Sequence, residues 1–303
     1  MEMQPYVTAP SPAVNNAVCR LYVEGSETSL DTSILDALFR KCPVHIRAIG
    51  SCNSVESVAQ AFAKEEPKSF FLIDRDHYHK EKDLDWNRFQ TGETNLLIWQ
   101  KKELENYFID PDFLIRSEFL REGATLEQLR SQVLGRSQKR LYLDVANYVI
   151  VSMRESMKEN WINILTNPND CPDVKTALVR ILHHQSLEII KQRVNKITLE
   201  SEVESRFHSY LHEMTGDSET LQYDKGKWLD MVSGKSILEE LMNNSGLFQN
   251  SRNGEQWVGR ERMIDIARFL ISEVNENHFP QDFTKLKRLV LQRARQLPSQ
   301  KSN

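Results

Sequence analysis

The chain has 303 residues, of which 40% are hydrophobic and 27% are charged, and its formal net charge at pH 7 is −4. This length and composition fit an ordinary globular protein with one sizeable core or two smaller ones. No apolar run approaches the ~18 residues of a membrane span, and the N-terminus does not read as a secretory signal, so we expect a cytoplasmic protein with no membrane association. Four scattered cysteines without a C-x-x-C pair argue against a disulfide framework or a thiolate zinc site.

Residues 1–17 are rich in Pro, Ser, Asn and Ala without periodicity, which predicts a flexible N-terminal arm. Four short apolar segments that follow the arm predict β-strands: Arg20 to Gly25, Val44 to Gly50, Ser69 to Asp74, and Asn95 to Gln100. Helical spacing of apolar residues predicts a helix from Thr28 to Arg40 and a second helix capped by Asn53. The charged link from Asp76 to Thr94 is only faintly helical, and we interpret it as a flank of the active site.

Alternation of helices with continuous apolar strands predicts a four-stranded parallel sheet flanked by helices, which we place in an α/β domain at residues 18–118. After Pro111 the strand patterns end and long helical periodicities begin, so an all-α C-terminal domain is expected at residues 119–303. The last predicted helix contains TKLKRLVLQRARQ, with five basic residues and no acid. Its basic side is either a solvated face or a phosphate-contacting face.

Acidic residues follow two of the predicted strands. Glu24 ends the first strand, Asp74 ends the third, and Asp76 comes two residues later. The carboxyl ends of parallel strands form one edge of the sheet, where ligands bind in open α/β folds, and residues i and i+2 of an extended strand point to the same side. Gathered carboxylates repel one another unless protons or a divalent cation compensate, and oxygen ligands favour Mg²⁺ or Mn²⁺ over zinc. The pattern therefore predicts a metal site for phosphoryl chemistry, although acids at strand ends also serve as helix caps.

Three stretches of the chain together resemble a toprim domain: Tyr22 to Glu27 (YVEGSE), Leu72 to Asp76 (LIDRD) and Glu103 to Tyr107 (ELENY). The first and the last are similar to the OLD-like toprim nucleases of bacterial phage defence, and the size and the helical second half resemble most closely the toprim effectors of PARIS defence systems. The resemblance covers about residues 18 to 115. The run after Asp76 departs from the D-x-D-x-x-G of topoisomerases and primases, so strand passage and priming are not expected.

The resemblance implies a role for each matching acid. Glu24 would serve in general acid/base catalysis or in metal binding, and Asp74 with Asp76 would be the metal-binding pair. Glu27 would be an accessory metal ligand, and Glu105 would complete the site.

Basic residues near these acids are candidate substrate contacts. Arg75, Lys101 and Lys102 lie close to the acids in sequence and could neutralise a phosphate, and His77 could contact substrate, although an exposed loop explains it equally well.

The resemblance also implies a function: a Mg²⁺- or Mn²⁺-dependent endoribonuclease that cleaves transfer RNA and stops translation in abortive infection. It further implies an ABC-type ATPase partner that holds the nuclease inactive until a phage trigger, and a homodimer when active. The chain has no Walker A motif, so ATP sensing would come from another protein. Two alternatives stay open, namely an OLD-type DNA nickase or DNase and a non-catalytic toprim binding subunit.

Overall fold

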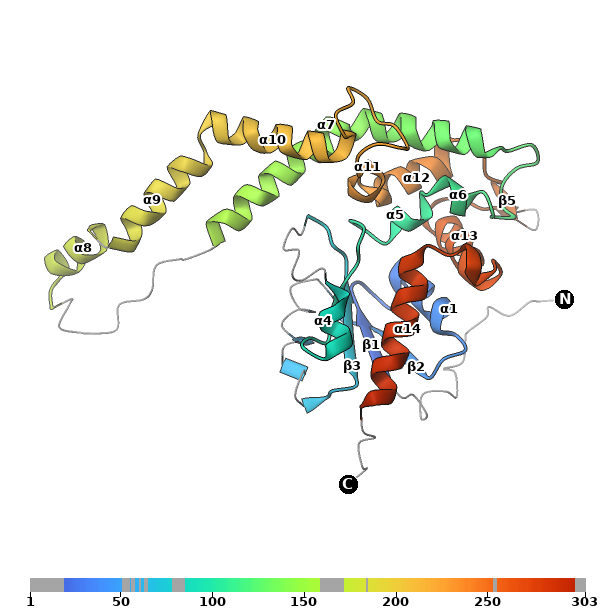
Figure 1. The fold of residues 1–303 in the computed structure, drawn as a ribbon, viewed down its shortest axis with the longest axis horizontal. Coiled ribbons are helices and arrows are strands. Elements are labelled where there is room, and N and C mark those ends of the chain that lie inside the picture. The colour runs from blue at the N-terminus through green and yellow to red at the C-terminus, as the bar shows by residue number, and fades with distance from the viewer. Residues whose placement is uncertain are drawn as a thin grey trace. The chain divides into compact units, whose positions relative to one another are not determined.

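The computed structural model describes residues 19–50, 55, 58, 59, 61, 62, 65–77, 85–158, 172–183, 185–252 and 255–297. The predicted N-terminal arm, residues 1–17, and the predicted cap Asn53 lie outside the described residues. The chain divides into two compact units (Figure 1). Unit 1 comprises Met1–Arg136 together with Leu229–Asn303, and unit 2 comprises Ser137–Trp228.

Unit 1 is built around a four-stranded sheet whose strands are all parallel. The strands are β1 (Cys19–Val23), β2 (Val44–Ala48), β3 (Ser69–Ile73) and β4 (Leu96–Ile98). Their order across the sheet is β2-β1-β3-β4. All five residues of β3 are buried, as expected for a parallel strand covered on both faces. The predicted four-stranded parallel sheet flanked by helices is therefore confirmed, with strand bounds within two residues of the expected ones.

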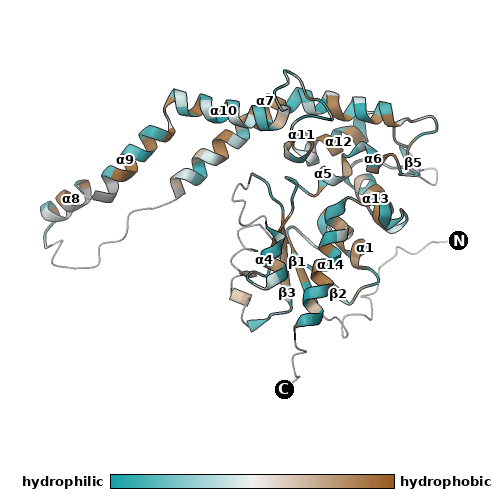
Figure 2. Cartoon of the chain, in the orientation of Figure 1, coloured by the Kyte–Doolittle hydropathy of each residue, from teal (hydrophilic) through white to brown (hydrophobic). Residues whose placement is uncertain are grey.

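Alternate residues of the strands face two different helical layers. On one face, Val55 and Ala59 pack in a cluster with Phe71, Ile73 and Ile98. Every described residue at positions 55–65 is helical, which supports the second predicted helix. Figure 2 shows how strongly apolar residues are concentrated in the strands.

The other face of the sheet is covered by α1 (Leu30–Phe39), α4 (Trp86–Thr91) and α14 (Gln281–Gln296), and α14 contacts both of the other helices (Figure 1). Phe70 of β3 meets Phe89 of α4 at 5.1 Å between ring centroids. The apolar residues of α14 are buried in this layer: Phe283, Leu286, Leu289, Val290 and Ala294. The last predicted helix of the chain thus belongs to the layer that covers the sheet.

Two of the five basic residues of α14 bind other parts of unit 1. Arg293 donates hydrogen bonds to the carbonyl oxygens of Phe89 and Thr94, which ties α14 to α4 and to the loop after it. Lys287 pairs with Glu276 at 2.6 Å. Arg293 and Lys287 are therefore engaged within the protein, and the choice between a solvated face and a phosphate-contacting face concerns the other basic residues of α14.

The remaining helices of unit 1 come from two distant parts of the chain. They are α5 (Glu105–Phe108), α6 (Pro111–Leu114), the first part of α7 (Leu126–Lys158), α11 (Trp228–Met231, which begins at the unit boundary), α12 (Gly234–Asn244), α13 (Gly259–Ser272) and the 3₁₀ helix Glu276–His278. A two-residue antiparallel pair, β5 (Ser251–Arg252) with β6 (Glu255–Gln256), precedes α13. Strand pairing thus recurs after Pro111, where the sequence pattern predicted helices only.

Unit 2 contains the rest of α7 with α8 (Val174–Leu182), α9 (Gln185–Ile197) and α10 (Glu200–Thr215). Tyr148 of α7 contacts Tyr210 of α10, with ring centroids 5.4 Å apart. Arg206 of α10 donates to the hydroxyl groups of Ser152 and Ser156 at 3.1 and 3.3 Å. A helical C-terminal region is therefore present, as expected.

The division into units differs from the predicted split at residue 118. Helices α12, α13 and α14 belong to the unit that holds the sheet, because α12 packs on α5 and α13 packs on α1. Contacts between residues more than 100 positions apart leave no trace in local periodicity, so the sequence pattern could not show them. No helix among the described residues is long and apolar enough to cross a membrane.

Candidate functional site

The connections of the sheet create a switch point between β1 and β3. From β1 the chain crosses to β2 on one side, and from β2 it returns past β1 to β3 on the other side. Because the two crossovers leave in opposite directions, a crevice opens at the carboxyl ends of these strands, and ligands bind there in open α/β sheets. Glu24 directly follows β1, and Asp74 directly follows β3.

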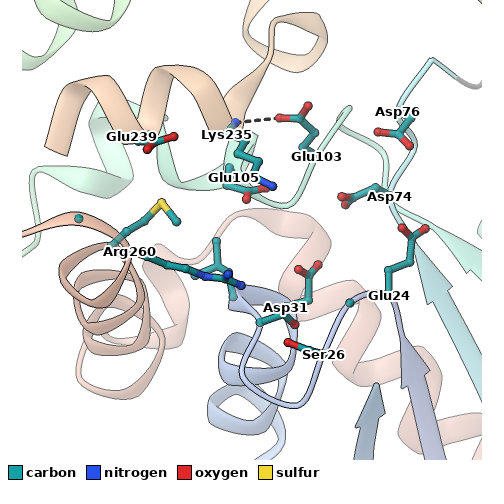
Figure 3. A pocket seen from close by; sticks show the side chains of 15 residues that line it. Glu24, Ser26, Asp31, Asp74, Asp76, Glu103, Glu105, Lys235, Glu239 and Arg260 are labelled. Atoms are coloured by element: carbon teal, nitrogen blue, oxygen red, sulfur yellow. Dashed lines mark hydrogen bonds between the residues drawn. The ribbon is translucent and has the colours of Figure 1, made fainter. Parts of the chain in front are cut away.

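Both residues line a cavity of about 560 Å³ within unit 1 (Figure 3). Seven carboxylates and two cationic side chains share its walls: Glu24, Asp31, Asp74, Asp76, Glu103, Glu105, Glu239, Lys235 and Arg260. The structure thus gathers four of the predicted site residues, namely Glu24, Asp74, Asp76 and Glu105, in one cavity.

The turn after β1 positions the first carboxylate and the start of α1. Gly25 has a φ of +95°, which disfavours side chains, and its amide donates to the carbonyl oxygen of Gly50 at 2.8 Å. A Cβ at this position would lie 3.0 Å from that of Ser29. Ser29 caps α1 by accepting from the amide of Thr32, so Asp31 lies in the first turn of a helix that begins at the same edge as Glu24.

The two aspartates after β3 reach the cavity by different routes. Asp74 accepts a hydrogen bond from the amide of Leu104 at 3.0 Å, which fixes one of its oxygens. Asp76 has a φ of +47°, and its amide donates to the carbonyl oxygen of Lys102 at 2.7 Å. The expected extended i, i+2 arrangement is therefore wrong, because β3 ends at Ile73 and Asp76 lies in a left-handed turn, a conformation that aspartate tolerates better than most residues.

The segment after β4 is fixed by a buried asparagine. Asn106 is fully buried, accepts from the amide of Glu103 at 3.0 Å, and donates to the carbonyl oxygens of Leu229 and Val232 at 2.9 and 3.0 Å. Glu103 in turn accepts from the backbone amide of Lys235 at 2.7 Å. These bonds attach the start of α12 to the strand-end segment that carries Glu105.

Burial and mutual repulsion raise the pKa values of the cavity acids. The pKa of Asp74 is well above its ordinary value because of burial and then the charges of Asp31, Glu105, Asp76 and Glu24. Burial followed by the charge of Asp31 raises the pKa of Glu105 to about 7. Burial likewise raises the pKa of Asp31 to about 6, although Lys235 and Arg260 oppose the rise. The cavity therefore favours protons or cations at neutral pH.

The raised pKa of Glu105 predicts a pH-dependent stability. Between the ordinary value of 4.5 and about 7, the unfolded chain loses this proton while the folded chain keeps it, so stability falls as pH rises through that window. We expect Glu105→Gln to stabilise the protein at pH 8 in EDTA, by on the order of 3 kcal/mol, and to have little effect near pH 5. Urea unfolding followed by tryptophan fluorescence measures both values, with the exposed Glu122→Gln as control. A loss of stability in Glu105→Gln at pH 8 would contradict this reading.

Glu27, predicted as an accessory metal ligand, does not line the cavity. Its carboxylate is exposed, lies 3.9 Å from the guanidinium of Arg47, and accepts from the amide of Ala48 at 3.4 Å. It precedes the cap Ser29 and therefore points toward β2, whereas Asp31, inside the helix, faces the cavity. In the structure Asp31, and not the Glu27 that the resemblance implies, lines the cavity.

The four predicted substrate contacts are also absent from the cavity walls. Arg75 donates to the carbonyl oxygen of Gln100 at 2.9 Å, and Lys101 pairs with Asp230 at 3.1 Å. Lys102 is 3% exposed, and its charge lowers the pKa of Asp76 against the larger effect of burial. His77 does not line the cavity either.

Five charged residues of the cavity were not predicted as site residues from the sequence: Asp31, Glu103, Lys235, Glu239 and Arg260. Asp31 could have been found, because a helix after a parallel strand begins at the edge where that strand ends. Lys235 and Arg260 come from α12 and α13, and their approach to the strand ends depends on long-range packing.

The donor set suits a hard divalent cation, since carboxylate oxygens at this edge are the ligands that Mg²⁺ and Mn²⁺ prefer. Within the described part of the chain, however, no group of three or more His, Cys, Asp or Glu side chains is arranged to hold a metal ion. The acids therefore share the cavity without forming a finished coordination shell. Ion binding would require side-chain rotations that bring their oxygens together.

Comparison with known proteins does not assign the chain to a family, because no family model, curated protein or solved structure matches it. The class that the fold itself defines is an α/β unit with an acidic cavity at the switch point of a parallel sheet.

Proposed function

We propose that the protein is a Mg²⁺- or Mn²⁺-dependent phosphodiester hydrolase of the toprim type that cleaves RNA. The observation that carries the proposal is the gathering of Glu24, Asp31, Asp74, Asp76 and Glu105 in one cavity at the switch point. Such a concentration of carboxylates is costly for the fold without counter-charge, and acids of this kind in a cleft indicate a functional site.

Each acid has a role in the proposed reaction. Asp74, Asp76 and Glu24 would hold the metal, and Asp31 and Glu105, which line the same cavity, would supply further oxygens (Figure 3). The cation, when bound, neutralises charge on the phosphate and activates the attacking water. Glu105, whose pKa is about 7, is suited to exchange a proton near neutral pH.

The substrate and the biological setting rest on the resemblance to OLD-like toprim nucleases. On that basis we propose transfer RNA as the substrate and arrest of translation in phage defence as the outcome. We further propose that an ABC-type ATPase holds the nuclease inactive until a trigger appears and that the released nuclease acts as a homodimer.

A cleavage assay tests the proposal and separates it from its alternatives. Purified wild type and Glu24→Gln are incubated with Mg²⁺ or Mn²⁺ and either end-labelled total transfer RNA or supercoiled plasmid. We expect discrete RNA fragments that EDTA abolishes, at least a roughly 10²-fold slower reaction in Glu24→Gln, and intact plasmid. Nicking of the plasmid alone would favour an OLD-type DNA nuclease. Binding of RNA or DNA without cleavage of either would favour a non-catalytic subunit.

A further inference from the structure

Two cationic side chains, Lys235 and Arg260, line the cavity among its seven carboxylates. Arg260 lies in the first turn of α13, and Figure 3 shows its side chain extending from that helix into the cavity toward Asp31. Among the described residues, no hydrogen bond or ion pair is found for its guanidinium group, although several carboxylates share the cavity. Its charge acts on Asp31, and its five N–H donors remain available to a ligand.

The start of α13 is held in place by a second arginine. Arg262, which is 2% exposed, donates to the carbonyl oxygens of Gln249 and Met242 and to the side-chain oxygen of Asn243. That same oxygen accepts from the amide of Gly259 at 3.2 Å. The residues on both sides of Arg260 are thus fixed to the end of α12, so the arginine projects from a rigid element.

The charges of the cavity indicate what Arg260 recognises. The carboxylates outnumber the cations, so without a metal the natural partner of Arg260 would be a carboxylate. Bound divalent cations would occupy those oxygens and leave the guanidinium without a carboxylate partner. A phosphate group of the substrate then supplies the negatively charged partner, and its oxygens accept two parallel hydrogen bonds from an arginine, which a lysine cannot donate.

We infer that Arg260 is a catalytic residue that binds the scissile phosphate of the substrate beside the metal-binding acids. This inference rests on the proposed function and adds to it a residue from the C-terminal part of the chain. Charge stabilisation of this kind matters most in the transition state, when negative charge on the phosphate oxygens is redistributed.

The test compares Arg260→Ala, Arg260→Lys and Arg268→Ala with wild type. Arg268 is an exposed arginine on the same helix that does not line the cavity, so its variant controls for the loss of one positive charge from α13. We expect Arg260→Ala to lower kcat/KM for transfer RNA by about 10²-fold, mostly in kcat, and Arg260→Lys to recover part of the loss. Arg268→Ala should retain activity within about twofold of wild type.

A second readout separates substrate binding from damage to the metal site. Thermal shift with Mn²⁺ should be as large in Arg260→Ala as in wild type or larger, because the change removes a positive charge near the ion. If wild type cleaves and Arg260→Ala matches Arg268→Ala, the inference is wrong while the proposed function stands. If Arg260→Ala loses both activity and the Mn²⁺ shift, its role is structural and the inference fails. If wild type cleaves neither RNA nor DNA, the proposed function fails and the inference with it.

Discussion

Asparagine in place of Asp74 is expected to slow metal-dependent cleavage of transfer RNA by at least about 10³-fold, equivalent to roughly 4 kcal/mol of transition-state stabilisation, while the fold stays intact. Asp74 stands at the carboxyl end of β3. The charges of four other carboxylates in the cavity raise its pKa. An asparagine keeps the side-chain oxygen that accepts from the amide of Leu104. The substitution therefore removes the charge without removing the hydrogen bond.

The same variant should be more stable than wild type in metal-free buffer at pH 8. Loss of one buried negative charge relieves the repulsion from Asp31, Glu105, Asp76 and Glu24. Single-turnover cleavage and thermal unfolding in EDTA measure the two effects. Asp112→Asn is the matched control, because Asp112 is exposed and pairs with Arg130 outside the cavity. If Asp74→Asn cleaves transfer RNA as fast as wild type does, Asp74 is not a catalytic or metal-binding residue.

Gly234→Ala is expected to destabilise unit 1 by at least about 3 kcal/mol. A Cβ on Gly234 would lie 2.6 Å from both the backbone nitrogen and the side-chain oxygen of Asn106. Asn106 cannot yield, because it is fully buried and bonded to Glu103, Leu229 and Val232. The added methyl group must therefore push α12 away from α5, which also displaces the cavity wall that carries Lys235.

Urea unfolding followed by tryptophan fluorescence measures this loss, and Gly135→Ala provides the control. Gly135 lies within α7, and a Cβ there would meet nothing within 4 Å. The control should be neutral or up to about 1 kcal/mol more stable, because alanine favours the helix. If Gly234→Ala unfolds like Gly135→Ala, α12 does not pack on α5 as the structure has it.

The sheet was predictable because its signal is local. A continuous apolar run such as Ser69 to Asp74 reads as a buried strand, and the acids that end β1 and β3 then fall on one edge by the geometry of parallel strands. Chain order alone does not give the order β2-β1-β3-β4, yet any arrangement of parallel strands would have placed Glu24 and Asp74 at the same edge.

The rest of the site depends on information that local patterns lack. Ser29 caps α1, so Glu27 lies two residues before the cap and Asp31 lies two residues after it, inside the helix. The exact start of this helix therefore decides which of the two acids faces the cavity. Lys235 and Arg260 reach the strand ends only because α12 packs on α5 and α13 packs on α1. Lys101, which is near the acids in sequence, pairs instead with Asp230. Proximity in sequence was thus a poor guide to the cationic residues of the cavity.

Direct titration of Mn²⁺ into the metal-free protein at pH 8 tests the central claim most simply. If the acids that follow β1 and β3 form a divalent-metal site, calorimetry will show saturable binding to wild type and at least about tenfold weaker binding to Asp74→Asn. Wild-type protein that binds no Mn²⁺, or that binds it no more tightly than Asp74→Asn, would contradict the assignment of the acidic cavity as a metal centre.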